Sequence, residues 1–314
     1  MILPKLEYKK AQNISDAIAF YESTNGQVRY LAGGTDLIPL VKLRLSTPKA
    51  IIDLKGIEEL KAISRRRGWL AIGANVTLFE LKNNLMVREY FPALYKSLDV
   101  TSCETLQMRG TIGGNILQDT RCLFYNKSLE WRTARGLCLK MGGEKCNVVP
   151  NAKTCFSNYC SDNALSLVAL SASVRLVGPQ GERKIKLEKI FSGDGRYPFT
   201  LAPGEILAEI LIPAQRSKGA YEKLRVRDSI DYPLLGVAAS IKENNGKVSV
   251  GGIGSAPLVY NLKNLNDRTF KEVAEKASAH AKPVSNTTLS PAYRKKMVGV
   301  LVQRAIKKAL MEGK

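Results

Sequence analysis

Apolar and polar positions alternate over the first fifty residues in a way that predicts short helices and strands in turn. Apolar residues recur at helical spacing over residues 14–24, which predicts a helix there. An apolar run at residues 28–32 predicts a strand, and a second helix is expected over residues 37–45. The sequence GGTD at residues 33–36 predicts a tight turn between them. The first unit is therefore helix, strand, glycine turn and helix.

The same kind of alternation continues toward the middle of the chain. Strands are expected at residues 51–54 and 69–74, and helices at residues 77–85 and 90–99. A second glycine turn follows, with the sequence TIGGN at residues 111–115. Like the first turn it contains a pair of glycines, so the chain carries two glycine turns of similar sequence.

Residues 120–160 break this pattern. They hold cysteines, aromatic residues and many charges without a clear period, so no secondary structure is expected in them. A segment of this length without its own helices or strands is usually functional. The apolar pattern resumes at residues 165–170, and the turn GPQG at residues 178–181 predicts a hairpin between the runs on either side of it.

The last hundred residues predict a separate unit. A polar connection at residues 213–218 is a plausible domain boundary. Strands are then expected at residues 220–226, 235–242 and 247–253, with a turn before the last of them. Two helices complete the chain, at residues 270–281 and 291–311. This pattern predicts an antiparallel sheet backed by helices.

Composition narrows the class of protein. The chain has 314 residues, 45% of them hydrophobic and 24% charged, which is typical of a globular protein with two domains. Its net charge is +20, but the basic residues recur along the whole chain. A nucleic-acid binder usually concentrates them on one face, so we do not expect nucleic-acid binding and favour a solvated basic surface, or one that meets acidic partner subunits.

The chain is expected to be soluble and cytoplasmic. The first residues contain no continuous apolar stretch of the kind that a signal peptide has. The longest mainly apolar run, at residues 164–177, is too short to span a bilayer, and Arg175 interrupts it. No membrane partner is therefore expected.

The two glycine turns are candidates for a phosphate site. Without a Cβ atom, glycine lets backbone N–H groups approach an anion, and successive N–H groups form an anion-binding nest. A helix that starts directly after the turn adds its positive end. Each turn alone is more often an ordinary turn, but two of them together could hold the diphosphate of a dinucleotide between them.

Four of the six cysteines form a second candidate site. Cys122, Cys138, Cys146 and Cys155 have the spacing C-x15-C-x7-C-x8-C, which matches neither a common zinc module nor the compact ferredoxin pattern. Four thiolates suffice for a [4Fe–4S] cluster or for zinc, and a disulfide is a poor default in a reducing compartment. The alternative is a set of unrelated buried cysteines. The polar surroundings of the segment argue against it, as do the basic residues that could offset the charge of a thiolate-bound cluster, namely Arg121, Arg132, Arg135, Lys140 and Lys145.

No catalytic residue is expected in this chain. Cys103 and Cys160 do not extend the cysteine series and are interpreted as structural or incidental. His280 is the only histidine, which excludes imidazole triads and sites with several histidine ligands.

The motifs together resemble a known family. The segments LAGGTDLIPL (31–40), TIGGN (111–115), GEILAEILIP (204–213) and YEKLRVRDSIDYPLLG (221–236) resemble, in the same order, the FAD subunits of the xanthine dehydrogenase and carbon-monoxide dehydrogenase family. The resemblance implies an α+β fold, with a two-part FAD-binding domain of the PCMH type over residues 1–213 and a C-terminal domain of antiparallel sheet plus helices over residues 214–314. It also implies a set of residues around the FAD. These are Arg29, Tyr30, Leu31, Ala32, Gly33, Gly34, Thr35, Asp36, Thr101, Thr111, Ile112, Gly113, Gly114, Asn115, Asp162, Leu207 and Lys223.

The segment at about 120–160 departs from most members of that family. It inserts about forty residues before Ser161 and Asp162, and it resembles the cysteine-bearing insert in the β subunits of 4-hydroxybenzoyl-CoA reductases. That resemblance implies that Cys122, Cys138, Cys146 and Cys155 hold a [4Fe–4S] cluster.

The implied function is electron transfer within a molybdenum enzyme. The resemblance implies a molybdopterin-bearing large subunit, a small subunit with [2Fe–2S] clusters, a dimer of heterotrimers and ferredoxin as electron donor. The reaction would be the reductive dehydroxylation of 4-hydroxybenzoyl-CoA to benzoyl-CoA. Three alternatives remain open: a flavoprotein that passes substrate electrons outward to an acceptor, a basic binding module stapled by zinc, and a structural subunit without a redox group.

Overall fold

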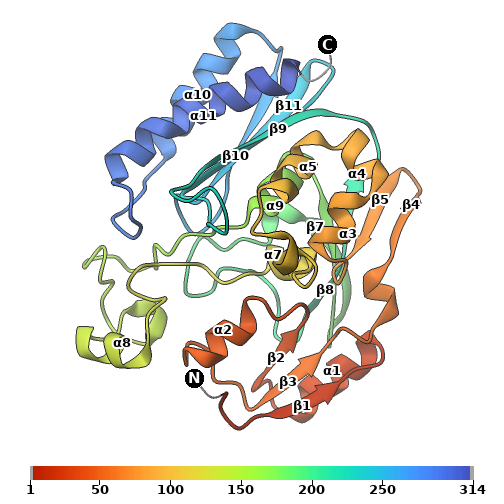
Figure 1. Ribbon diagram of the computed structural model, residues 1–314, viewed down its shortest axis with the longest axis vertical. Helices are drawn as coiled ribbons and strands as arrows, with labels where there is room; N and C mark the ends of the chain where they lie inside the picture. Colours follow the sequence, from red (N-terminus) through yellow and green to blue (C-terminus); the bar gives the residue numbers. More distant parts are fainter. Residues whose placement is uncertain (1–2, 312–314) are drawn as a thin grey trace.

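Three β-sheets are arranged along the long axis of the molecule (Figure 1). The computed structural model describes residues 3–311, so the outermost residues of the two predicted domains, 1–2 and 312–314, lie outside the described part. Within residues 3–311, no helix is long and apolar enough to cross a membrane.

The first sheet is small and parallel. Its middle strand, β3, pairs with β1 on one side and β2 on the other, and helices connect the strands, as parallel pairs require. The first helix begins where the Asn13 side chain accepts a hydrogen bond from the Asp16 N–H at 2.8 Å. The elements of this unit are β1 (Glu7–Lys10), α1 (Ile14–Ser23), β2 (Val28–Leu31), α2 (Leu37–Lys42) and β3 (Ala50–Asp53).

The central sheet is antiparallel and has the strand order β4-β5-β8-β6-β7. Its strands are β4 (Ile63–Arg66), β5 (Trp69–Gly73), β6 (Ser173–Gly178), β7 (Gly181–Lys186) and β8 (Ile206–Pro213), with the short 3-10 helices η1 (Glu58–Lys61) and η3 (Leu187–Lys189) beside them. Strand β8 contributes to two cores: Leu207 and Ile210 enter the central core, whereas Ile206 and Ala208 enter the core of the first sheet. A shift in the register between β8 and β6 at this point interrupts the strict alternation of the strand. This strand therefore fastens the first two sheets to each other.

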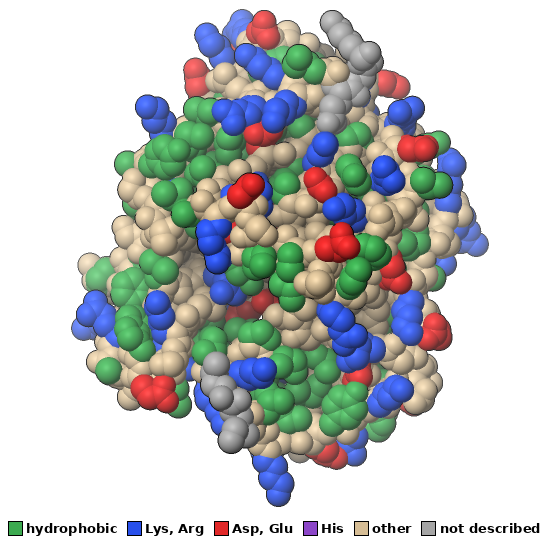
Figure 2. Space-filling view, in the orientation of Figure 1, with side chains coloured by type: hydrophobic (Ala, Val, Ile, Leu, Met, Phe, Trp, Pro, Cys, Tyr) green, Lys and Arg blue, Asp and Glu red, His purple; other side chains and the backbone are tan. Residues whose placement is uncertain are grey.

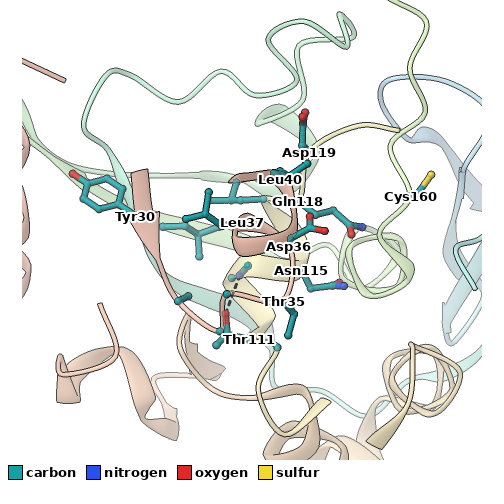
Figure 3. A pocket seen from close by; sticks show the side chains of 18 of the residues that line it. Tyr30, Thr35, Asp36, Leu37, Leu40, Thr111, Asn115, Gln118, Asp119 and Cys160 are labelled. Atoms are coloured by element: carbon teal, nitrogen blue, oxygen red, sulfur yellow. Dashed lines mark hydrogen bonds between the residues drawn. The ribbon is translucent and has the colours of Figure 1, made fainter. Parts of the chain in front are cut away.

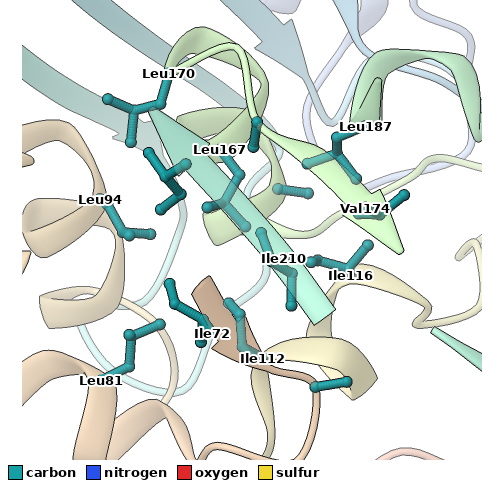
Figure 4. Packing of buried hydrophobic residues seen from close by; sticks show 14 of the residues in the cluster. Ile72, Leu81, Leu94, Ile112, Ile116, Leu167, Leu170, Val174, Leu187 and Ile210 are labelled. Atoms are coloured by element: carbon teal, nitrogen blue, oxygen red, sulfur yellow. The ribbon is translucent and has the colours of Figure 1, made fainter. Parts of the chain in front are cut away.

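Short helices pack against the central sheet around one core. Figure 4 shows this core, in which Ile72, Leu94, Ile112, Leu167 and Ile210 approach one another from strands and helices far apart in the sequence. The helices are α3 (Leu78–Asn83), α4 (Leu85–Tyr90), α5 (Pro92–Asp99), α6 (Glu104–Gln107), α7 (Ile112–Ile116) and α9 (Asp162–Ala169). Every residue of α9 is buried, because this helix lies between the central core and the last sheet.

The last sheet is antiparallel with the strand order β12-β11-β10-β9, and two long helices cover one face of it (Figure 1). Its elements are β9 (Lys218–Leu224), β10 (Leu235–Lys242), β11 (Asn245–Gly251), β12 (Leu258–Lys263), α10 (Asp267–His280) and α11 (Pro291–Met311). The predicted antiparallel sheet backed by helices is confirmed, and so is the α+β fold.

The prediction that residues 120–160 lack secondary structure was wrong. They contain α8 (Leu129–Arg135), which Ser128 caps, and the short η2 (Leu139–Met141). Strands β1, β4, β8 and β12 were not predicted, because short or uniformly apolar runs give no clear period. The helix expected at residues 90–99 is α5, which begins at Pro92, whereas α4, which ends at Tyr90, was not predicted as a separate helix.

Candidate functional site

A cavity of about 690 Å3 lies where the first sheet, the central sheet and the cysteine-bearing segment meet. Figure 3 shows its lining from close by: Asp36, directly before α2, approaches Asn115 and Gln118, which lie in and just after α7. The two glycine turns at residues 33–36 and 111–115 form part of the same wall. The fold therefore brings the two sequence motifs together in one cavity.

Close packing between backbones requires the glycines. A Cβ atom on Gly33 would lie 1.9 Å from the carbonyl oxygen of Arg109, and one on Gly113 would lie 2.8 Å from that of Ala74. Gly34 has a φ of +77°, which side chains rarely tolerate. Without glycine at these positions the first turn could not lie against the segment that leads into the second.

The two turns differ in their free hydrogen-bond donors. In the second turn, the N–H of Ile112 donates to Val76, that of Gly113 to Ala74, and that of Gly114 to the Thr111 hydroxyl at 3.1 Å. In the first turn, the N–H groups of residues 33–36 have no acceptor among the described residues. The first turn therefore offers an anion a row of free donors, while the second is braced by its own bonds. The following helices, α2 and α7, have only six and five residues, so the turn amides rather than the helix dipoles carry this property.

A buried ion pair borders the cavity. Asp162 lines it and accepts hydrogen bonds from the Tyr221 hydroxyl at 2.6 Å and from Lys223 Nζ at 3.0 Å. Lys223 is itself bound to the carbonyl of Val100 at 3.0 Å. Burial raises the pKa of Asp162, and the charge of Lys223 opposes that shift. Lys223 therefore holds the Asp162 carboxylate in position without itself lining the cavity.

A second charged group closes another part of the wall. Asp36 is half-buried, and burial raises its pKa, while the charge of Arg121 opposes the increase. Arg121 lies over the ring of Tyr232, with its guanidinium carbon 4.0 Å from the ring centroid. Tyr232 lines the cavity beside Asp36, so this stack joins the cysteine-bearing segment to the loop before β10.

Most residues that the sequence predicted to surround a flavin line the cavity. They are Arg29, Tyr30, Ala32, Gly33, Gly34, Thr35, Asp36, Thr101, Thr111, Gly113, Gly114, Asn115, Asp162 and Leu207. Leu31 and Ile112 belong to the same turns, but their side chains are buried in the protein rather than facing the cavity.

Several lining residues were missed by the sequence analysis. Gln118, Asp119, Tyr125, Lys140 and Cys160 all line the cavity. Gln118 and Asp119 directly follow the second turn, so extending that motif by four residues would have found them. Cys160 was interpreted as structural or incidental, and it lies in this wall, where burial raises the pKa of its thiol to about 12.

The side-chain amide of Gln118 indicates what kind of ligand fits the cavity. Its side chain is 7% exposed, and its Nε2 has no hydrogen-bond partner among the described residues. A buried donor without a partner costs about 1–3 kcal/mol, so such groups are normally satisfied. A ligand with acceptor atoms, as FAD has, would satisfy this one. Together with the free amides of residues 33–36, Gln118 gives the cavity the chemistry that a flavin dinucleotide needs.

The four predicted metal-ligating cysteines line a second, smaller cavity. Cys122, Cys138, Cys146 and Cys155 come from separate parts of the inserted segment and face this one space. The Val149 N–H donates to Cys146 Sγ at 3.5 Å. Burial and then the neighbouring Cys155 and Cys138 raise the pKa of Cys122 to about 11, and backbone amides oppose the shift. The structure thus gathers four cysteines that are up to 33 positions apart in the sequence.

The described residues form no site for a single metal ion. Within residues 3–311, no three metal-ligating side chains surround one point closely enough to hold one metal ion. A zinc ion draws its thiolates to about 2.3 Å. Ligands of a cluster with four irons stand further apart, because each thiolate binds a different iron. Cys103, by contrast, is partly exposed and lies outside both cavities.

The basic residues of the insert have mixed roles. Arg132 is buried and donates to the carbonyls of Leu43 and Arg44, so it ties α8 to the end of α2. Lys140 is bound to Asp119 and separates the two cavities. Figure 2 shows Lys and Arg scattered over the face in view instead of gathered in one continuous patch.

Fold and site together define a flavin-binding subunit of the class that serves molybdenum enzymes, and comparisons with known proteins agree. The family model for the FAD binding domain in molybdopterin dehydrogenase matches residues 4–215. The chain belongs to this family and is an FAD-binding medium subunit of the xanthine and CO dehydrogenase type.

Three relatives show how far the similarity extends. The aldehyde oxidoreductase FAD-binding subunit PaoB of Escherichia coli (strain K12) is 30% identical over 261 residues, which cover 80% of this chain and 82% of that protein. The glyceraldehyde dehydrogenase medium chain of Sulfolobus acidocaldarius is 29% identical and covers 98% of this chain and 99% of its own length. A crystal structure of Cu,Mo-CO dehydrogenase matches with a TM-score of 0.79 and 25% identity, over 98% of this chain and 99% of that one.

Proposed function

We propose that this chain carries FAD in the 690 Å3 cavity and relays electrons from a partner subunit's molybdenum site outward to an acceptor. The observation that carries the proposal is that the N–H donors at residues 33–36 and Nε2 of Gln118 have no acceptor among residues 3–311. The named relatives are dehydrogenases and an oxidoreductase, which supports an outward flow of electrons.

In this function the chain's residues hold and orient the flavin. The free amides of residues 33–36 hold the diphosphate, because four successive donors match its negative charge. Gln118 donates to an acceptor atom, and Asp162, fixed by Lys223, accepts from a donor. FAD supplies one- and two-electron chemistry, and the protein fixes its position and tunes its potential.

The partners follow from the same proposal. The relatives are named as medium chains or FAD-binding subunits, so the complex would contain a molybdopterin-bearing large subunit and a small subunit with [2Fe–2S] clusters, paired as a dimer of heterotrimers. The FAD-binding domain would span residues 1–213 and the C-terminal domain residues 214–314. In support, β8 is the last strand of the central sheet along the chain and ends at Pro213, and β9, the first strand of the last sheet, begins at Lys218.

The cysteine cavity favours a second candidate. Four buried or half-buried cysteines around one space suit a [4Fe–4S] cluster, and an outward relay through FAD alone has no need of one. A reductase of the 4-hydroxybenzoyl-CoA type would use it to bring electrons in from ferredoxin. In this second function Cys122, Cys138, Cys146 and Cys155 are the ligands.

One experiment separates the candidates. The complex is purified without oxygen, and flavin, iron, sulfide and zinc are assayed per chain together with the visible spectrum. FAD without iron supports the outward flavoprotein, whereas FAD with about four iron and four sulfide supports the cluster-bearing reductase. Zinc without flavin would overturn both. Bleaching of the flavin by reduced ferredoxin in the absence of substrate would then establish inward flow.

A further inference from the structure

The two cavities share a wall. Among their lining residues, Tyr125 and Lys140 face both the large cavity and the cysteine cavity. Tyr125 lies three positions after Cys122, and Lys140 lies two positions after Cys138. Each part of the wall is therefore anchored next to a cysteine of the smaller cavity.

Lys140 is buried in this wall as a cation. Its side chain is 4% exposed, and Nζ donates to Asp119 Oδ1 at 2.5 Å, to Thr120 Oγ1 at 2.5 Å and to the carbonyl of Gly195 at 2.7 Å. All three partners accept, so they match the three donors of an ammonium group. Hydrogen bonds from an ammonium group to a carboxylate are charge-assisted and stronger than those between neutral groups.

Tyr125 completes the wall. Lys140 Nζ lies 4.7 Å from the centroid of its ring, which is a cation–π contact. Burial and the neighbouring Asp119 raise the pKa of the Tyr125 phenol, so it stays neutral. The charge between the two cavities is therefore that of Lys140, partly offset by Asp119, which lines only the large one.

We propose that Lys140, held over Tyr125, is an electrostatic tuning residue that sets the reduction potentials of the flavin and of the cluster together. The proposal rests on the cluster-bearing function above. Each centre becomes more negative when it gains an electron, and a nearby fixed positive charge in a medium of low dielectric stabilises that form. If one electron passed between the cluster and the flavin, one centre would be oxidised and the other reduced by that electron.

The test measures both potentials by redox titration of the anaerobic complex. Lys140→Met is expected to shift the equilibrium of each centre toward its oxidised form by about tenfold, which is 59 mV for a one-electron couple. Lys140→Arg keeps the charge and is expected to keep both potentials. Lys247→Met is the matched control, because Lys247 is also paired with a carboxylate, Glu188, but lines neither cavity.

Asp119→Asn provides a second variant that leaves Lys140 in place. Removing the negative partner makes the wall more positive, so both potentials are expected to rise instead of falling. General damage to the site would not give opposite signs for the two variants. Iron, sulfide and flavin contents are measured in every sample. Absence of iron from the wild type would overturn the cluster and this proposal together, whereas full cofactor contents with one or both potentials unmoved would overturn this proposal alone.

Discussion

The backbone of Gly33 lies directly against the carbonyl group of Arg109, where a Cβ atom would come within 1.9 Å of the oxygen. Gly33→Ala must therefore push apart the two segments that shape the flavin cavity. We expect FAD affinity to fall at least about tenfold, equivalent to about 1.4 kcal/mol, with overpacking costing about 1–3 kcal/mol of stability. Bound flavin per chain and urea unfolding measure the two effects. Gly254→Ala is the control, since a Cβ there meets nothing within 4 Å.

Gln118→Leu should raise the stability of the flavin-free protein and lower its affinity for FAD. The substitution removes a buried donor that has no partner among the described residues, so the flavin-free protein is expected to gain about 1 kcal/mol of stability. FAD binding loses a hydrogen bond and should weaken about tenfold, which is about 1.4 kcal/mol. Thermal unfolding with and without added FAD checks both. A lower melting temperature of the flavin-free variant would contradict the assignment of Gln118 as a ligand donor.

The contributions of Asp162 and Lys223 to the stability of the fold should depend on each other. Breaking a buried ion pair leaves one charge uncompensated, so Lys223→Met is expected to cost about 3–5 kcal/mol of stability. The double variant with Asp162→Asn removes both charges and should recover most of that loss, although its FAD affinity stays reduced. Urea unfolding of the single and double variants forms a double-mutant cycle. Additive losses would mean that the two residues act independently.

The cysteine cavity gives a matched pair of variants. In the proposed cluster-bearing function, Cys138→Ala removes one of the four facing thiols and should abolish iron binding, while the flavin content stays within about twofold of the wild type because the large cavity keeps its lining. Cys103→Ala removes a thiol outside both cavities and should leave iron and flavin unchanged. Equal iron contents in the two variants would refute the assignment of Cys138 as a ligand.

The hydrogen-bonded carboxylate of Glu205 makes the free energy of unfolding depend on pH in the acidic range. Its carboxylate accepts hydrogen bonds from Arg183 at 2.6 and 2.8 Å, and these hold its pKa below the ordinary 4.5. The unfolded chain binds the proton more tightly, so this contribution is present above pH 4.5 and is lost as the pH falls through the lower folded value. Because Arg183 is partly exposed, it amounts to roughly 1 kcal/mol or less. Unfolding of Glu205→Gln at pH 7 and pH 4 should show a smaller loss on acidification than the wild type.

The sequence by itself determined the local motifs. The glycines at residues 33, 34 and 113 were recognisable because close backbone approach and a left-handed φ leave few other residues possible. The antiparallel C-terminal sheet was predictable from alternation and a turn, which are local properties. The grouping of four cysteines in one inserted segment was likewise visible without a structure.

Only the tertiary structure decided how these parts meet. β8 lies between β5 and β6 although more than a hundred residues separate it from β5, and no local pattern encodes that pairing. The difference between a turn with free amides and a turn with satisfied amides depends on acceptors at Ala74 and Val76, which are distant from the turn in sequence. The placement of Lys140 and Tyr125 between two cavities likewise arises from long-range packing. Such relationships follow from which surfaces are buried together, and a linear pattern of apolar and polar residues does not specify them.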